Sequence, residues 1–358
     1  MELFMVNYLD SPPKNVIVRL PNWLGDLVMA TPILTDLRHQ WPDAKITALC
    51  QGAVGALIQS DPHIDELLVF KRSRRRFSNP ESKEILKQLR TGFYDLGLLL
   101  TNSFSSSWLF WRGHVQQRIG YATHWRRWLL NLPISLPKTR HTQHLVLTYK
   151  GLLEPLGIPV SSTAPKLYLT NQETITAKER LSHLFPSSLS DPFIIGINPG
   201  AAYGTAKCWL PERFQQLTQR LLQNPKNMLL FFGDQAGAPL VNEICKAFPA
   251  RVINLAGQTS LRELMALIQS CHLFLTNDSG PMHIASALGV PLVALFGSTN
   301  DVTTGPYHGG LVIHKHVECS PCYRRVCPID FRCMKRIEVE EVYQALQEFI
   351  PSAPTKLG

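Results

Sequence analysis

The sequence lacks any long hydrophobic run. Across its 358 residues, no uncharged apolar stretch reaches the roughly 18 residues of a membrane-spanning helix. The longest candidate, residues 96–111, is interrupted by Thr101, Asn102 and four serines. The amino terminus has an acidic residue at position 2 and no basic segment ahead of an apolar one, so it does not match a secretory signal peptide. These absences predict a cytoplasmic protein without a membrane span.

The sequence also carries no helix-turn-helix, zinc-finger or RNP-like signature of a nucleic-acid-binding fold. Its net charge is nonetheless +9, and +7 of this lies within residues 1–160, notably at residues 71–76 and at Arg126 and Arg127. Such a surplus attracts polyanions or an anionic membrane surface, although a solvated loop would explain it equally well. We therefore expect no nucleic-acid partner, although the aromatic and basic residues within 118–128 lend that class some support.

Apolar runs of strand length alternate with amphipathic segments of helix length along the whole chain. The expected strands are residues 15–20, 45–49, 66–70, 95–101, 193–198, 228–232, 252–254, 272–276 and 291–296. The expected helices are residues 26–40, 52–60, 81–91, 211–223, 240–248, 261–270, 282–288 and 339–349. This alternation predicts an α/β fold with parallel sheets and helices on both faces.

The alternation occurs twice, and the chain is longer than one hydrophobic core usually supports. A segment rich in proline, serine and threonine, residues 155–192, separates the two halves. We expect domains at residues 1–180 and 181–358, the second ending in a cysteine-rich loop, residues 319–333, and a terminal helix. Because ligands of open parallel sheets bind beyond the carboxyl ends of the strands, chemistry is sought where strands run into helices.

The first such junction, residues 20–26, follows the first expected strand. Gly25 permits an unusual backbone angle, and Asp26 opens the helix. One interpretation makes Asp26 a helix cap only. The other makes it a general base facing an interdomain cleft, where a carboxylate removes the proton of a sugar hydroxyl that attacks an anomeric carbon.

The second junction follows the strand at residues 193–198. Asn198, Gly200 and further small residues let the loop fold closely around a ligand, and Lys207 offers a point charge for phosphate. The loop matches neither a Walker motif nor G-x-G-x-x-G. The alternative is a plain connection with a surface lysine, and Trp209 is expected to pack in the core.

The third junction, residues 275–289, joins a hydrophobic strand to a helix through a polar turn. The free N–H groups of the helix start suit a diphosphate. Asp278, Ser279 and Gly280 form the turn, and His283 lies in the first helical turn. A simple cap would explain the acid and the serine, but not the density of small and polar groups.

Four of the eight cysteines cluster with the spacing C-x2-C-x4-C-x5-C, at Cys319, Cys322, Cys327 and Cys333. In a reducing cytosol, this spacing favours a structural zinc ion over disulfides. Free thiols packed in a loop remain the alternative. No nearby histidine or carboxylate arrangement indicates a catalytic metal.

In chain order, these segments resemble the ADP-heptose:lipopolysaccharide heptosyltransferase family, and within it the heptosyltransferase II group. The resemblance spans roughly residues 15–350 and rests on residues 19–26, 198–209, 277–283 and 319–335. It implies a GT-B fold of two Rossmann-like lobes, with the acceptor in the first lobe, the donor in the second and a cleft between them. It further implies inverting transfer of L-glycero-D-manno-heptose from ADP-heptose to the heptosyl-Kdo-lipid A inner core in lipopolysaccharide biosynthesis.

The resemblance also implies roles for individual residues. Asp26 would be the base, without a catalytic metal or other required cofactor. Lys207, Ser279 and Gly280 would hold the diphosphate, with His283 beside it. The family often has a glutamate for the ribose after the second strand of the donor lobe, where Pro239 aligns here, so Asp234 is the candidate substitute.

The acceptor implied by the resemblance is an anionic glycolipid, which places the enzyme at the inner face of the inner membrane. Arg72, Arg74, Arg75 and Arg76 are then candidates for contacting its acidic groups. The alternatives are a related GT-B transferase with another donor or core position, and a non-catalytic module that binds sugar nucleotides.

Overall fold

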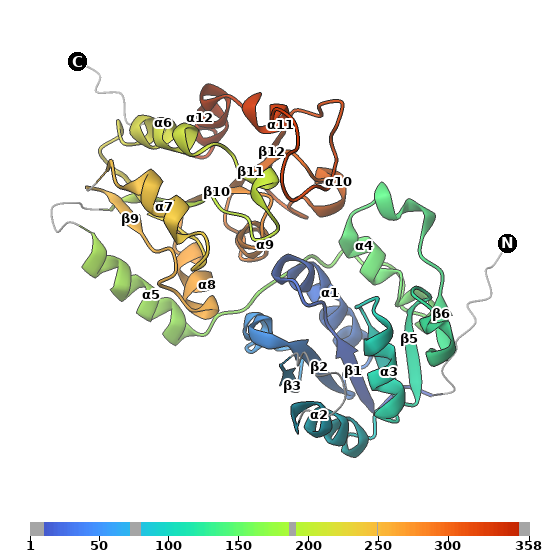
Figure 1. Cartoon of the computed structure of the whole chain (residues 1–358). Helices are drawn as coiled ribbons and strands as arrows, with labels where there is room; N and C mark the ends of the chain where they lie inside the picture. The colour runs from blue at the N-terminus through green and yellow to red at the C-terminus, as the bar shows by residue number, and fades with distance from the viewer. Residues whose placement is uncertain (1–10, 72–79, 186–190, 249, 351–358) are drawn as a thin grey trace. The chain divides into compact units, whose positions relative to one another are not determined.

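The computed structural model describes residues 11–71, 80–185, 191–248 and 250–350, and Figure 1 shows their path. The chain forms two compact units, Met1–Tyr168 and Leu169–Gly358. The expected boundary between residues 180 and 181 falls inside helix α5 (Asn171–Leu184). This helix belongs to the second unit because its Glu173 pairs with Arg262 of helix α8 (Leu261–Gln269).

The first unit is built on a six-stranded sheet in the order β3-β2-β1-β4-β5-β6, with parallel neighbours throughout. The strands are β1 (Asn15–Arg19), β2 (Lys45–Gln51), β3 (Glu66–Phe70), β4 (Leu96–Leu99), β5 (Gln117–Tyr121) and β6 (Leu132–Ile134). The α-helices are α1 (Leu24–Gln40), α2 (Pro80–Thr91), α3 (Phe104–Arg112) and α4 (Leu145–Lys150). The 3₁₀ turns are η1 (Gly52–Ile58), η2 (Arg126–Leu129), η3 (Lys138–His141) and η4 (Glu154–Leu156).

The central strands of this sheet are apolar on both faces, as parallel strands covered by helices require. Ile17 of β1 packs with Leu99 of β4 and Phe110 of α3 in one core cluster. Helix α1 lies near α4, and its residues from Leu27 to Leu34 are all buried. A helix that is apolar around most of its circumference belongs in the interior, and α1 therefore anchors the unit.

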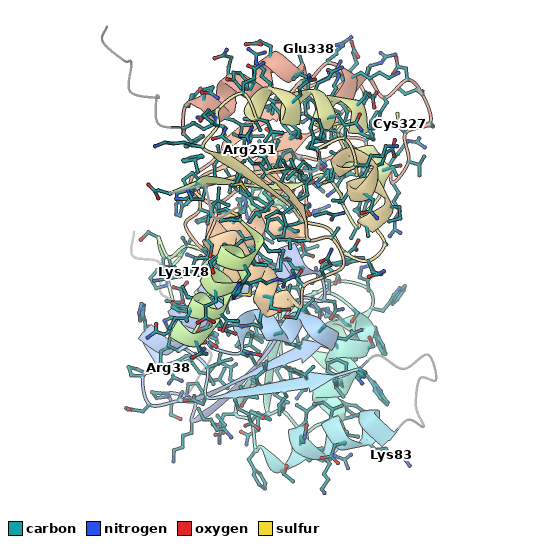
Figure 2. All side chains as sticks on the ribbon, turned by 90° about the vertical axis from the view of Figure 1, so that its left-hand side faces the viewer. Arg38, Lys83, Lys178, Arg251, Cys327 and Glu338 are labelled. Carbon is teal, nitrogen blue, oxygen red and sulfur yellow. The ribbon has the colours of Figure 1, made fainter. Side chains whose placement is uncertain are left out.

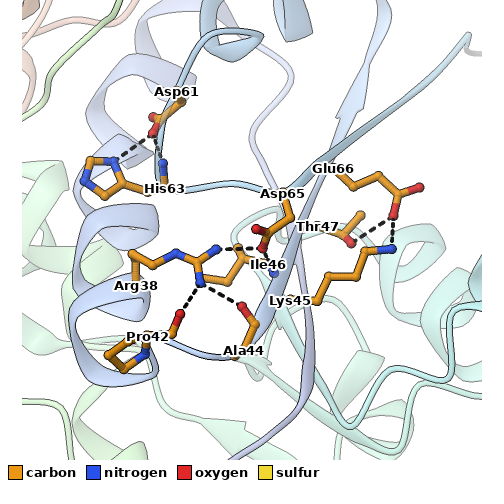
Figure 3. Close-up of polar contacts among 10 residues, drawn as sticks. All are labelled: Arg38, Pro42, Ala44, Lys45, Ile46, Thr47, Asp61, His63, Asp65 and Glu66. Carbon is orange, nitrogen blue, oxygen red and sulfur yellow. Dashed lines mark hydrogen bonds and ion pairs between the residues drawn. The ribbon is translucent and has the colours of Figure 1, made fainter.

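Polar contacts fix the end of α1 to the sheet (Figure 3). Arg38 donates to Asp65 at 2.6 Å and to the carbonyl oxygens of Pro42 and Ala44, each at 2.8 Å. The Asp65 carboxylate also accepts the backbone N–H of Ile46 at 2.7 Å. The turn from α1 into β2 is thus fixed by satisfied hydrogen bonds, which leaves the opposite end of α1 in a defined position.

The second unit repeats the plan, with a parallel six-stranded sheet in the order β12-β11-β10-β7-β8-β9. The strands are β7 (Phe193–Asn198), β8 (Asn227–Phe231), β9 (Val252–Asn254), β10 (Leu273–Asn277), β11 (Leu292–Phe296) and β12 (Leu311–His314). Besides α5 and α8, the helices are α6 (Pro211–Leu221), α7 (Ala238–Cys245), α9 (Gly280–Ala287), α10 (Asp301–Thr304), α11 (Arg332–Lys335) and α12 (Val339–Gln347), with the 3₁₀ turn η5 (Thr205–Lys207).

The predicted α/β class, parallel pairing and two-fold repetition are confirmed. The expected helix at residues 52–60 is instead the 3₁₀ turn η1. Several elements were not anticipated, among them α3, β5 and β12. Within the described residues, no helix is both long and apolar enough to cross a membrane.

Candidate functional site

Both sheets share one topological feature that determines where ligands bind. In the second unit, β7 lies between β8 and β10, so successive connections leave the sheet in opposite directions on either side of the β7–β10 pair. Such a switch point opens a crevice at the carboxyl ends of the strands. Asn198 ends β7 and Asn277 ends β10, and Asn198 is in register with Thr276. The second and third junctions therefore meet there.

Side-chain hydrogen bonds join the two junctions directly. Asn198 Nδ2 lies 3.2 Å from the Ser279 hydroxyl and 2.9 Å from the carbonyl oxygen of Gly200, and donates to both. Ser279 Oγ is also 2.9 Å from Thr276 Oγ1. Asn198, Gly200 and Ser279, which lie far apart in sequence, thus form one contiguous polar surface.

A buried carboxylate, that of Asp278, pairs with Lys207 next to this surface. Lys207 Nζ lies 2.6 Å from Asp278 Oδ2, and Asp278 also accepts the hydroxyl of Thr299. The Asp278 side chain is only 5% exposed and that of Lys207 14% exposed. Asp278 therefore orients Lys207, because a buried carboxylate requires a partner and would itself repel phosphate. Thr299 was not singled out from the sequence.

Helix α9 begins directly beside Ser279. Ser279 is its N-cap residue, yet its hydroxyl makes no capping bond and is directed instead to Asn198 and Thr276. Gly280 and Pro281 follow at the helix start. The first turn thus offers its partial positive charge without a side-chain cap. His283 lies in this turn and is buried.

The loop that carries Lys207 contacts the cysteine-rich segment. The Arg325 guanidinium and the Lys207 ammonium group lie 5.3 Å and 4.9 Å from the ring centre of Tyr203. Gly204 is required here, since a Cβ would lie 2.3 Å from the carbonyl oxygen of Arg325. Tyr203 also donates its hydroxyl to the Tyr323 carbonyl at 2.7 Å. Tyr203 and Arg325 were not identified from the sequence, because only the fold brings them together.

Trp209 and Asn277 fix the backbone next to this site through hydrogen bonds. The backbone N–H of Trp209 donates to Asn277 Oδ1 at 3.0 Å, and Asn277 Nδ2 donates to the Pro199 carbonyl at 2.7 Å. The indole N–H donates to the Ile337 carbonyl at 3.0 Å. As expected, Trp209 packs in the core.

Asp234 stabilises the turn in which it lies. Its carboxylate accepts the backbone N–H of Gly237 at 2.7 Å and closes the turn after β8. The residue is exposed, and this bond is ordinary turn chemistry. No described contact connects Asp234 with the polar surface.

In the first unit, a buried arginine shapes the turn ahead of α1. Arg19 donates to the Leu20 carbonyl and to Asn22 Oδ1, and stacks 5.0 Å from the ring centre of Phe70. Burial lowers the pKa of Arg19 to about 10. No role for Arg19 was predicted from the sequence. It was recognisable only as a charge at the end of an apolar strand.

Asp26 lies in the first turn of α1 and is half-buried. The N-cap position is occupied by Trp23, which makes no side-chain capping bond. The negative charge of Asp26 is favourable at this end of the helix. The pKa of Tyr149 in α4 is raised well above its usual value, mainly by burial and then by the negative charge of nearby Asp26.

The cysteine-rich loop shows no compact cluster of thiols among the described side chains. Within the described part of the chain, no three of Cys319, Cys322, Cys327 and Cys333 bring their sulfurs within 4.8 Å of one another, although Cys333 is near enough to the other three to interact with them electrostatically. Cys319 is exposed and Cys333 buried, and Figure 2 labels Cys327 at the periphery of the second unit. Four thiolates at about 2.3 Å from one zinc ion would lie closer together, so the described positions favour the alternative of free thiols.

One of the arginines counted in the surplus of positive charge, Arg126, does not lie on the surface. Arg126 is fully buried and donates to the carbonyl oxygens of Tyr121 and Thr101 and to Asn102. Burial lowers its pKa to about 10. Arg126 is therefore an internal support. The predicted contacts Arg72, Arg74, Arg75 and Arg76 lie outside the described residues.

Comparisons with known proteins agree with one another. The model of glycosyltransferase family 9 (heptosyltransferase) matches residues 83–331. Lipopolysaccharide heptosyltransferase 2 of Salmonella typhimurium is 30% identical over 81% of this chain and 85% of its own length. Lipooligosaccharide heptosyltransferase 2 of Campylobacter jejuni is 28% identical over 94% and 99%.

Among solved structures, the E. coli ADP-heptose lps heptosyltransferase II superimposes with a TM-score of 0.78 at 25% identity, covering 94% of this chain and 98% of its own. The expected resemblance and the GT-B type of fold, with two Rossmann-like units and parallel sheets, are thereby confirmed. The family model spans well over half of the sequence and includes the polar surface around Lys207. The chain belongs to glycosyltransferase family 9, the heptosyltransferases.

Proposed function

We propose that this enzyme transfers L-glycero-D-manno-heptose from ADP-heptose to the heptosyl-Kdo-lipid A inner core in lipopolysaccharide biosynthesis, with inversion at the anomeric carbon. The observation that carries the proposal is the pairing of Lys207 with buried Asp278 beside the start of α9. A cation and a helix N-terminus at one strand edge suit a diphosphate. The E. coli relative named above is an ADP-heptose enzyme.

The second unit is the proposed donor domain. Lys207, Ser279 and Gly280 hold the diphosphate, with Asn198 and Gly200 completing the loop and His283 beside it. As the glycosidic bond breaks, the departing ADP gains negative charge, and the fixed positive groups stabilise this charge without reorganisation. Asp234 is the proposed ribose contact, for which it would exchange its bond to Gly237.

The first unit is the proposed acceptor domain, and Asp26 the general base. Its carboxylate takes the proton of the attacking heptose hydroxyl while the carbon–oxygen bond to ADP breaks on the opposite face of the sugar. One displacement inverts the anomeric centre, so neither a covalent intermediate nor a metal is needed. Arg19 keeps the preceding turn in place through Leu20 and Asn22.

The acceptor lipid implies a cytoplasmic enzyme that works at the inner face of the inner membrane. The surplus of positive charge in residues 1–160 supports this location. Trp125 and Trp128 are 89% and 87% exposed in the same unit. Tryptophan at such a position favours a lipid–water interface.

The test is ADP release from ADP-heptose in the presence and absence of heptosylated Kdo-lipid A. Acceptor-dependent release with an inverted anomeric product, read by NMR, would support the proposal. Release with another nucleotide sugar only, or with another core acceptor only, would point to a related GT-B transferase. Binding of ADP-heptose without turnover on any acceptor would indicate a non-catalytic module and contradict the proposal.

A further inference from the structure

Three potential metal ligands come together where β12 ends, outside the polar surface and outside the cysteine motif. Asp301 begins α10, His314 is the last residue of β12, and His316 follows two positions later. One ligand atom from each lies within 4.8 Å of the others. The side chains of His314, Asp301 and His316 are 2%, 20% and 65% exposed.

Hydrogen bonding determines which nitrogen of His314 carries its proton. The Ser320 hydroxyl must donate to the Gly297 carbonyl oxygen, because that oxygen can only accept. His314 Nε2, 2.8 Å from Ser320 Oγ, must then donate to the hydroxyl. A neutral His314 therefore has a lone pair on Nδ1.

That lone pair faces another acceptor. His314 Nδ1 lies 2.9 Å from Asp301 Oδ1, and a carboxylate has no proton to share. A proton or another cation between the two atoms removes this repulsion. Either His314 is an imidazolium paired with Asp301, or a cation lies between the two atoms.

His316 favours the second arrangement. Its backbone adopts the left-handed region with φ 42°, which is costly for a residue other than glycine. In this conformation its ring centre lies 4.0 Å from that of His314, and its Nε2 is 3.7 Å from Asp301 Oδ2. An ion pair between His314 and Asp301 would need no second imidazole held against the first.

We propose that Asp301, His314 and His316 form a binding site for one divalent first-row transition-metal ion of the zinc type. Two imidazoles and a carboxylate are a ligand set that such ions accept. Tetrahedral ligands at about 2 Å from zinc are roughly 3.3 Å apart. The separations of 2.9 Å from His314 Nδ1 to Asp301 Oδ1 and of 3.7 Å from His316 Nε2 to Asp301 Oδ2 bracket this value. Ser320 orients His314 through its other nitrogen, as partners of ligating histidines do.

The ion would tie α10 to the end of β12 and to the start of the cysteine-rich loop. Ser320 links the site to Gly297 after β11, and Arg325 further along this loop contacts Tyr203 and Gly204. The role is therefore structural. It does not depend on the proposed sugar transfer.

The test uses the full chain carrying Cys319→Ser, Cys322→Ser and Cys327→Ser, so that thiols do not compete for the ion. Isothermal titration with Zn²⁺ and with Co²⁺ should give one ion per chain. Asp301→Asn and His316→Ala should each weaken binding at least tenfold, because each removes a ligand. His308→Ala, an exposed histidine on the segment between α10 and β12, should leave binding unchanged.

Either of two binding results would overturn the proposal. One is the absence of a bound ion in the cysteine-substituted chain. The other is binding that Asp301→Asn and His316→Ala leave intact. Nitrogen-15 NMR of the imidazoles adds an independent readout, because a His314 that stays doubly protonated with Zn²⁺ present would identify the ion pair instead.

Discussion

The pair of Glu173 and Arg262 should make the stability of the second unit depend on acid pH. Arg262 Nε lies 2.7 Å from Glu173 Oε1, and Glu173 Oε2 also accepts the backbone N–H of Thr170 at 2.8 Å. The hydrogen bond from Arg262 is the largest cause that lowers the pKa of Glu173 from 4.5 to about 2. This shift corresponds to at most about 3 kcal/mol, and solvent screening of the partly exposed carboxylate reduces it to about 2 kcal/mol.

The coupling between protonation and folding determines how this stabilisation depends on pH. A carboxylate whose folded-state pKa is depressed stabilises the fold fully above its unfolded pKa of 4.5, and this stabilisation disappears as pH falls towards about 2. Glu173→Gln removes the charge but keeps a side chain that suits the capping box with Thr170. The variant should therefore lose about 2 kcal/mol of unfolding free energy at pH 7 and much less at pH 3.

The assay is urea unfolding followed by tryptophan fluorescence at both pH values. Glu179→Gln, on the exposed side of the same helix, is the matched control and should change stability by less than about 0.5 kcal/mol. A deficit for Glu173→Gln that is the same at pH 7 and pH 3, or absent at pH 7, would refute the reasoning.

Three further predictions concern the site, its support and the membrane. Lys207→Ala should weaken ADP binding by about 2 kcal/mol, or roughly thirtyfold, in calorimetry, whereas Lys178→Ala on exposed α5 (Figure 2) should not. Trp209→Ala should cost about 3–5 kcal/mol in urea unfolding, because this fully buried ring loses both its packing and its bond to the Ile337 carbonyl; a loss below about 1 kcal/mol would contradict the packing. Replacing Trp125 and Trp128 together by alanine should reduce co-sedimentation with anionic vesicles while changing stability by less than about 0.5 kcal/mol; equal sedimentation would exclude these rings as membrane contacts.

The sequence predicted those parts of the fold in which local pattern and tertiary environment agree. The apolar runs that became β7 and β11 end where expected, because buried parallel strands are apolar on both faces. Strand β5 was missed because it contains Arg118 and Gly120. The reason for Gly120 lies elsewhere in the chain, since a Cβ would lie 2.8 Å from the Arg126 guanidinium.

The site was predictable as far as strand–helix junctions reveal it. Asn198, Lys207, Asp278 and Ser279 were all identified, and the fold pairs Asn198 with Ser279 and Lys207 with Asp278. The role of each residue was not visible, because no local pattern distinguishes a carboxylate that pairs with a lysine from a residue that binds a ligand. The cysteine spacing left both zinc and free thiols open for the same reason, since spacing alone does not fix where four sulfurs point.

The measurement that tests the central claim most directly is acceptor-dependent ADP release by Asp26→Asn beside the unmodified enzyme. Asp43→Asn, an exposed acid in the same unit, is the control. We expect the Asp26 variant to turn over about 10²–10⁴-fold more slowly while binding ADP-heptose with unchanged affinity, and the Asp43 variant to behave like the parent. An Asp26→Asn enzyme that keeps its rate would contradict the assignment of the base, and with it the proposed mechanism.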